Sequence, residues 1–141
     1  ASLSLLSHVL EKEGYEILAV SNGADALKIA AKAQPDLVML DVMMPGHDGY
    51  YVCRELKADP ATRDVPVIFI TSRNDMDSIV RGFQVGAVDY ITKPISPPIL
   101  KARVRTHLML KGARDYLKDQ NAYLEQELER RLRLRLQKPD A

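Results

Sequence analysis

The sequence has one cysteine, a formal net charge of only +1, and no apolar run close to the length of a membrane-spanning helix. A single cysteine excludes an internal disulfide, so the composition gives no sign of secretion. The balanced charge predicts no strong attraction to nucleic acid or to a membrane surface. The first residues also lack the basic stretch that opens a signal peptide. We therefore expect a cytoplasmic protein that contacts neither membranes nor nucleic acid directly.

What the chain does contain is an ordinary balance of hydrophobic (46%) and charged (28%) residues, over 141 positions that fit one domain with an additional element. Short apolar strands alternate with helical segments. The predicted strands are residues 16–20, 37–41, 67–71 and 88–91. The predicted helices are residues 3–10, 24–33, 50–56 and 75–85, followed by a long helix from residue 97. This alternation is typical of an α/β fold, in which a doubly wound parallel sheet has helices on both faces.

Polar residues stand at the ends of three predicted strands. Asp41 ends the second strand, Thr71 ends the third with Ser72 after it, and Lys93 follows the fourth. Because parallel strands have their carboxyl ends at one edge of the sheet, we expect these side chains to converge. A carboxylate can attack phosphorus, while an ammonium and a hydroxyl can hold the phosphoryl oxygens. Taken alone, Asp41 is equally well explained as a helix cap, but the three residues together favour phosphoryl chemistry.

The spacing of these residues resembles the receiver domain of two-component response regulators. The resemblance rests on Asp41 within Leu-Asp-Val-Met-Met-Pro-Gly-His-Asp-Gly, on Thr71 thirty residues later, and on Lys93-Pro94. It covers roughly residues 3–110 and implies a flavodoxin-like sheet with strand order 2-1-3-4-5. It also implies that Asp41 accepts the phosphoryl group, that Lys93 pairs with it, and that Thr71 is the switch hydroxyl. A cis peptide bond before Pro94 would turn the lysine toward the site.

Further roles follow from the same resemblance. Tyr90 matches the aromatic residue that rotates when Thr71 closes on the phosphoryl group, and Met43 stands where the family offers a backbone carbonyl to Mg²⁺. The implied partner is a sensor histidine kinase or a phosphotransfer protein. The helix at 75–85, the strand after it and the last helix would form the face that repacks. We expect this face to carry the signal by forming a homodimer.

One part of the family pattern is missing from this sequence. The family begins with a strand that ends in an acidic pair, which binds Mg²⁺ together with the phosphoacceptor, and no residues before Asp41 match it. We expect the natural protein to supply this first strand from residues ahead of Ala1. The alternative is a receiver-like dimerisation or interaction module that works without phosphorylation, because Mg²⁺ binding is weakened or absent without those carboxylates.

The last predicted helix runs from residue 97 to about residue 136, which is too long for a compact domain to cover, so its far half should project. Leucines recur in it at intervals of seven, with one asparagine four residues after the second. This pattern is typical of a coiled-coil seam with one polar core position, although a solvated helix is the alternative. The seam residues are Leu110, Leu117, Asn121, Leu124 and Leu128. We therefore divide the chain into a receiver domain (residues 1–110) and a helical extension (residues 111–141).

Two stretches of the last helix, Leu100–Leu108 and Gln120–Glu125, resemble linkers of multidomain response regulators that lead to HD-GYP cyclic-di-GMP phosphodiesterases or to GGDEF cyclases. We therefore expect any enzyme activity to lie outside this chain. Four arginines near its end are interpreted as a solvated helix end rather than a nucleic-acid interface. These are Arg130, Arg131, Arg133 and Arg135. A small-molecule-binding flavodoxin-like domain or enzyme is disfavoured, because neither a Walker nor a Rossmann glycine-rich loop is present.

Overall fold

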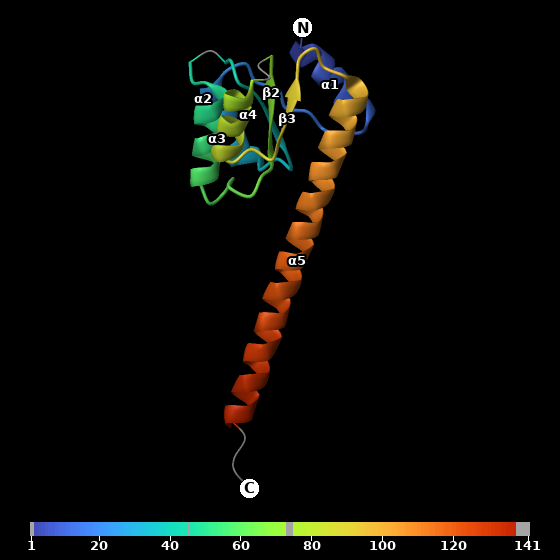
Figure 1. Ribbon diagram of the computed structural model, residues 1–141. Helices are drawn as coiled ribbons and strands as arrows, with labels where there is room; N and C mark the ends of the chain where they lie inside the picture. Colours follow the sequence, from blue (N-terminus) through green and yellow to red (C-terminus); the bar gives the residue numbers. More distant parts are fainter. Residues whose placement is uncertain (1, 45, 73–74, 138–141) are drawn as a thin grey trace. The chain divides into compact units, whose positions relative to one another are not determined.

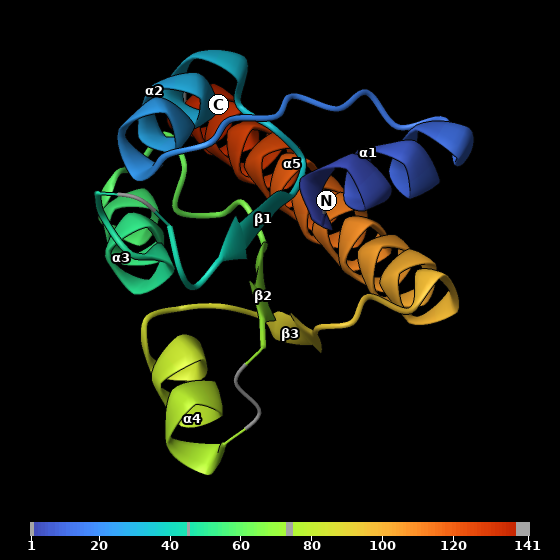
Figure 2. The ribbon, with the colours of Figure 1, turned by 90° about the horizontal axis from the view of Figure 1, so that it is seen from above.

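A computed structural model describes residues 2–44, 46–72 and 75–137. Figure 1 labels its helices and the strands β2 and β3, and Figure 2 also labels β1. In chain order they are α1 (Ser2–Lys12), α2 (Gly23–Ala33), β1 (Val38–Asp41), α3 (Gly49–Ala58), β2 (Val67–Thr71), α4 (Met76–Gln84), β3 (Asp89–Thr92) and α5 (Pro97–Gln137). The chain divides into two compact units, Ala1–Leu108 and Met109–Ala141. The first unit contains every element except the remainder of α5.

The first unit is built on a parallel sheet with strand order β1-β2-β3 within the described residues. Seen from above, α1 and the first part of α5 cover one face, while α2, α3 and α4 cover the other (Figure 2). These strands are the last three of the five that the flavodoxin-like order contains. The expected doubly wound α/β fold is therefore confirmed.

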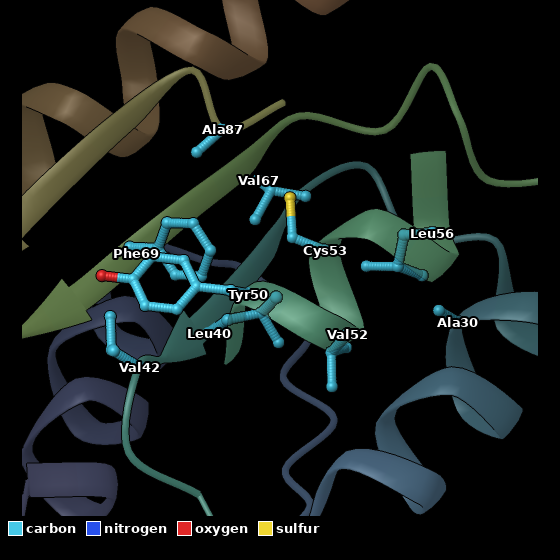
Figure 3. Packing of buried hydrophobic residues seen from close by; sticks show 10 residues of the cluster. All are labelled: Ala30, Leu40, Val42, Tyr50, Val52, Cys53, Leu56, Val67, Phe69 and Ala87. Carbon is cyan, nitrogen blue, oxygen red and sulfur yellow. The ribbon is translucent and has the colours of Figure 1, made fainter. Parts of the chain in front are cut away.

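The core consists of two clusters, one on each face of the sheet. All five side chains of β2 are buried, and they alternate between the two faces because successive side chains of a strand point in opposite directions. Val67 and Phe69 join the cluster under α2 and α3 (Figure 3). Ile68 and Ile70 join the cluster under α1 and the first part of α5. A strand buried on both faces explains why its sequence is apolar throughout.

The strand expected at residues 16–20 is not formed, and this prediction was wrong. Ile17 packs partly against the cluster under α1, but Leu18 is 58% exposed. A strand requires a neighbouring strand to accept its hydrogen bonds, and none lies beside this segment among the described residues. The apolar residues of the segment were recognised, but their periodicity does not show whether another strand is available to pair with them.

Side-chain caps fix where three helices begin. Asn22, Asp48 and Asp75 each accept a hydrogen bond from a backbone N–H group in the first turn of α2, α3 and α4. These bonds satisfy donors that a helix leaves open at its amino end. At the start of α3, a Cβ atom on Gly49 would lie 2.5 Å from the Asp41 carbonyl oxygen. Glycine therefore lets α3 start directly against the end of β1.

The second unit is the part of α5 from Met109 onward. The helix passes through Gly112 without a break, and none of the side chains at residues 109–133 is buried. Large apolar side chains are nevertheless frequent there. The exposed ones are Met109, Leu110, Tyr116, Leu117, Tyr123, Leu124, Leu128 and Leu132. Within the described residues, no helix is both long and apolar enough to cross a membrane.

Candidate functional site

The ends of all three strands meet at one edge of the sheet. Asp41 is the last residue of β1, and Thr71 is the last residue of β2 and pairs with Thr92 of β3. The backbone N–H of Lys93 donates to the Thr71 carbonyl oxygen at 2.8 Å, and that of Val42 donates to the Ile70 carbonyl oxygen at 3.1 Å. These backbone bonds hold the three chain segments in register just beyond the sheet.

The Asp41 carboxylate is oriented by two partners from this edge. The Lys93 ammonium donates to Oδ2 at 2.6 Å, and the backbone N–H of Met43 donates to Oδ1 at 3.0 Å. The side chains of Lys93 and Asp41 are 29% and 32% exposed, so the carboxylate is still reachable from solvent. The peptide bond between Lys93 and Pro94 is cis, as the sequence suggested. A held but accessible carboxylate next to an ammonium is suited to accept a phosphoryl group.

Thr71 is buried, with 6% of its surface exposed, and lines a small hollow between the sheet and α4. We call this the α4 hollow. Its walls include Val42, Tyr50, Phe69, Thr71, Gly82 and Tyr90. Its volume of about 10 Å³ is close to the space that one water molecule needs. The predicted switch hydroxyl and the predicted rotating aromatic therefore border the same hollow.

Tyr90 is half-buried, with its ring between residues of α4 and α5. The ring meets the edge of the Phe83 ring at a centroid distance of 6.1 Å, and the Arg103 guanidinium carbon lies 5.5 Å from its centroid. Arg103 also donates a hydrogen bond to the Tyr90 carbonyl oxygen. These contacts fix both the ring and the backbone of Tyr90 in its present position.

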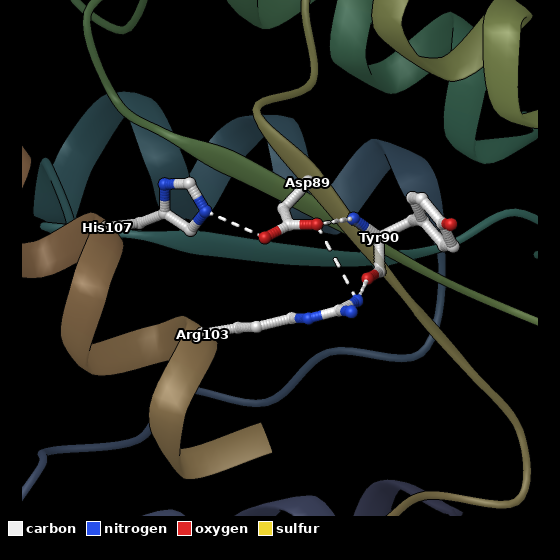
Figure 4. A network of polar contacts seen from close by, with 4 residues as sticks. All are labelled: Asp89, Tyr90, Arg103 and His107. Carbon is white, nitrogen blue, oxygen red and sulfur yellow. Dashed lines mark hydrogen bonds and ion pairs between the residues drawn. The ribbon is translucent and has the colours of Figure 1, made fainter. Parts of the chain in front are cut away.

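Asp89, next to Tyr90, links β3 to α5 through both of its carboxylate oxygens (Figure 4). Oδ1 lies 3.6 Å from the Arg103 guanidinium and accepts the Tyr90 backbone N–H at 2.8 Å, while Oδ2 lies 2.9 Å from His107 Nε2. Sequence reasoning did not identify this network. The available signal was weak: Arg103 and His107 are four residues apart, and so lie on one face of a helix.

The described residues offer only part of a magnesium site. Asp41 supplies a carboxylate, and no group of three or more His, Cys, Asp or Glu side chains that could hold a metal ion occurs in the described part of the chain. Mg²⁺ requires near-octahedral oxygen coordination, although water and substrate phosphate can supply several of the ligands. Asp41 would therefore contribute one carboxylate to such a site.

Cys53 and His47 lie outside this site. The Cys53 thiol is fully buried in the cluster of Figure 3, and burial raises its pKa from 9.0 to about 11, so it stays protonated and unreactive at neutral pH. His47 stacks on Tyr51 with ring centroids 4.2 Å apart. Among the described contacts, neither residue bonds to Asp41, Thr71 or Lys93.

Comparison with known proteins agrees with this geometry. The family model described as the response regulator receiver domain matches residues 1–105, and the chain therefore belongs to that family. Response regulator PleD from Caulobacter vibrioides is 43% identical over 122 residues, which are 86% of this chain and 27% of PleD. A probable cyclic di-GMP phosphodiesterase from Vibrio cholerae is 47% identical over 117 residues, 83% of this chain and 26% of that protein. The chain thus spans about a quarter of each relative.

Solved structures show the same fold. A putative response regulator from Chloroflexus aurantiacus superimposes with a TM-score of 0.73 at 36% identity, covering 75% of this chain and 87% of the other. The receiver domain of the sensor histidine kinase PA1611 from Pseudomonas aeruginosa has a TM-score of 0.70 at 27% identity, over 74% and 86% of the two chains. That structure holds a magnesium ion in its active-site cleft. The predicted resemblance to receiver domains is confirmed, and a receiver domain is a regulatory unit of two-component signalling.

Proposed function

We propose that this chain is a phosphorylation-dependent switch in which Asp41 accepts a phosphoryl group from a histidine kinase or a phosphotransfer protein. The observation that carries the proposal is the accessible Asp41 carboxylate, held by the Lys93 ammonium and the Met43 N–H in a chain of the receiver family. A carboxylate oxygen attacks phosphorus as the N–P bond of the donor phosphohistidine breaks. The imidazole leaves with the electron pair and takes up a proton, and an acyl phosphate remains on Asp41.

The new phosphoryl group brings charge and acceptor oxygens to the edge where Thr71 and Lys93 lie. The acyl phosphate carries about −1.5 to −2 charges where the free carboxylate carries −1, and the Lys93 ammonium and the Thr71 hydroxyl can bind its oxygens by charge-assisted hydrogen bonds. Inward movement of Thr71 changes the α4 hollow, and Tyr90, on another wall of it, follows. We take this as a shift between two populated states rather than a continuous deformation.

The surface that would report the switch is formed by α4, β3 and the start of α5. Three apolar side chains of α4 are exposed along one side of the helix, namely Met76, Val80 and Phe83. We propose that this face binds a second copy of the chain after phosphorylation. An exposed apolar set of this kind, next to a residue that moves, is a suitable site for a regulated homodimer.

We further propose that residues 111–137 of α5 extend the receiver domain (residues 1–110) as one strand of a coiled coil. Residues 138–141 of the predicted extension lie outside the described residues. The exposed leucines at intervals of seven residues, with Asn121 at one core position, support this. In the whole protein, this helix would connect the receiver to an output domain of the kind named in its Vibrio cholerae relative, a cyclic di-GMP phosphodiesterase, or to a cyclase. Any such enzyme activity belongs to that output domain.

Magnesium is proposed as the cofactor of the switch. The Asp41 carboxylate and the Met43 backbone carbonyl would contribute ligands, and the ion would neutralise charge on the transferring group. Binding by these two groups alone is expected to be weak.

The proposal is tested by incubating the 141-residue chain with a small phosphodonor and Mg²⁺ and measuring the intact mass. We expect a phosphoryl-sized gain in the wild type and none in Asp41→Asn, which keeps the shape of the side chain but lacks a nucleophilic carboxylate. A gain of the same size in both proteins would place the phosphoryl group elsewhere and contradict the proposal.

A second candidate function is a phosphorylation-independent dimerisation module. The observation that favours it is the incomplete acidic set around Asp41 in the described part of the chain. Under this reading the wild type gains no mass with the phosphodonor, yet is dimeric by light scattering. A mass gain that Asp41→Asn abolishes excludes it as the sole function.

A further inference from the structure

A tyrosine on α3 joins α4 to the rest of the first unit. Tyr50 is 5% exposed, and its hydroxyl donates to the Ser78 carbonyl oxygen of α4 at 3.2 Å. The Arg81 guanidinium carbon, also on α4, lies 4.3 Å from the centroid of the Tyr50 ring. The ring also packs at 5.3 Å against Phe69 of β2, and Figure 3 shows the two rings side by side. We call the contacts of Tyr50 with Ser78 and Arg81 the tyrosine clasp.

The remaining residues of α4 bury little side-chain surface. Among its residues only Gly82 is buried, and a Cβ atom at that position would lie 3.1 Å from the Phe69 ring. Met76, Val80 and Phe83 are exposed. A helix with so few buried side chains has low local stability. The tyrosine clasp is therefore one of the described attachments of α4, beside the Phe83–Tyr90 ring contact and the packing of Gly82 on Phe69.

The tyrosine clasp and the proposed switch share one space. Tyr50 lines the α4 hollow, and so do Thr71, Gly82 and Tyr90. Tyr90 is presently held by Phe83 and Arg103, and its inward rotation would bring its ring into the hollow that Tyr50 and α4 enclose. The hollow, at about 10 Å³, is far smaller than a tyrosine ring, so Tyr90 can enter it only if Thr71, the Tyr50 ring or α4 moves.

We infer that Tyr50 is a positioning residue that holds α4 in the unphosphorylated arrangement and so opposes the switch. The hydroxyl bond to Ser78 and the stack with Arg81 must loosen before α4 can move. Release of the tyrosine clasp should therefore shift the equilibrium toward the phosphorylated arrangement. The effect on switching rests on the proposed function, whereas the attachment of α4 does not.

The first test is amide hydrogen exchange of Tyr50→Phe, which removes one hydroxyl and keeps the ring. We expect exchange in α4 to rise about 2- to 10-fold in the unphosphorylated protein, the range expected for one neutral hydrogen bond, with α3 and β2 unchanged. Tyr51→Phe is the matched control, because Tyr51 stacks on His47 and not on α4. Unchanged exchange in α4, or an equal rise in α3 and β2, would overturn the inference that the tyrosine clasp holds α4 in place.

The second test measures phosphoryl occupancy at a limiting concentration of a small phosphodonor. We expect Tyr50→Phe and Arg81→Gln each to raise occupancy relative to the wild type, and the double variant to show less than the product of the two effects because both act on one contact. Faster exchange in α4 without higher phosphoryl occupancy would overturn the inference that Tyr50 opposes the switch. A wild type that gains no phosphoryl mass would contradict the proposed function, and hydrogen exchange would still decide the tyrosine clasp.

Discussion

The Asp41 carboxylate combines two properties that usually conflict at a single residue. One oxygen is paired with Lys93 and the other with the Met43 N–H, which fixes the direction of the group. About a third of its side-chain surface is still exposed (32%), so a donor can reach it. An ion pair this exposed contributes little to stability, which agrees with the proposed role of Asp41 as phosphoacceptor.

Replacing Lys93 should separate its contribution to function from its contribution to folding. In Lys93→Gln we expect phosphoryl uptake from a small phosphodonor to slow by about 100-fold, since one donor to the developing charge is lost. The free energy of unfolding should change by less than about 1 kcal/mol. Time-resolved intact mass and urea unfolding measure the two quantities.

Lys101→Gln is the matched control, because Lys101 pairs with Glu13 at 3.2 Å and not with Asp41. Uptake by Lys93→Gln at the rate of this control would show that the ammonium does not hold the phosphoryl oxygens.

Among the elements, α3 depends most directly on one residue that lacks a side chain. Gly49 allows the first turn of α3 to approach the Asp41 carbonyl oxygen. Gly49→Ala should lower the free energy of unfolding by about 1–3 kcal/mol, the usual cost of overpacking a filled site. Urea denaturation measures the change.

The chain contains a glycine for comparison. Gly112 lies in α5, and a Cβ atom there would meet nothing within 4 Å. Gly112→Ala should instead stabilise the helix by about 0.5–1 kcal/mol. Equal effects of the two substitutions would show that close approach is not the reason for glycine at position 49.

Elements with local signals could be predicted from the sequence. The helices α2, α3 and α4 follow capping residues, and β2 is an apolar run that only a doubly buried strand explains. The ends of β1 at Asp41 and of β2 at Thr71 were predicted correctly because each apolar run stops at a polar residue. The strand predicted at residues 16–20 was wrong for a different reason. A strand forms only when a second segment pairs with it, and the apolar pattern of one segment does not show whether such a partner exists.

Side-chain contacts between distant segments were beyond sequence reasoning. Tyr50 and Ser78 are 28 residues apart, and Asp89 and His107 are 18 apart. Neither pair has a spacing that identifies it, since the contacts arise only after α4 and α5 pack on the sheet. The Asp41–Lys93 pair, at a separation of 52 residues, was predicted because parallel strand ends share an edge and because the sequence resembles receiver domains.

At the scale of the whole molecule, the second unit carries a row of exposed leucines without a described partner element. If it forms a coiled coil, Leu117→Glu and Leu124→Glu should each convert the unphosphorylated protein from dimer to monomer, because a charge at a core position cannot be buried. Light scattering over a range of concentrations measures the mass.

Asp119→Asn is the control for these substitutions, since Asp119 lies on the opposite side of the helix from the leucine seam. A wild type that is monomeric at every concentration would contradict the coiled coil, while leaving the phosphorylation of Asp41 unaffected.

The central strand β2 divides the interior of the first unit into two separate compartments. Its odd-numbered residues serve the layer that contains Tyr50 and the α4 hollow, and its even-numbered residues serve the layer beneath α1 and the start of α5. A substitution in one layer is therefore expected to affect the packing of the other layer mainly through β2. Residues of α1 can therefore change with little effect on the switch, whereas the start of α5 stays coupled to it through the contacts of Arg103 with Tyr90.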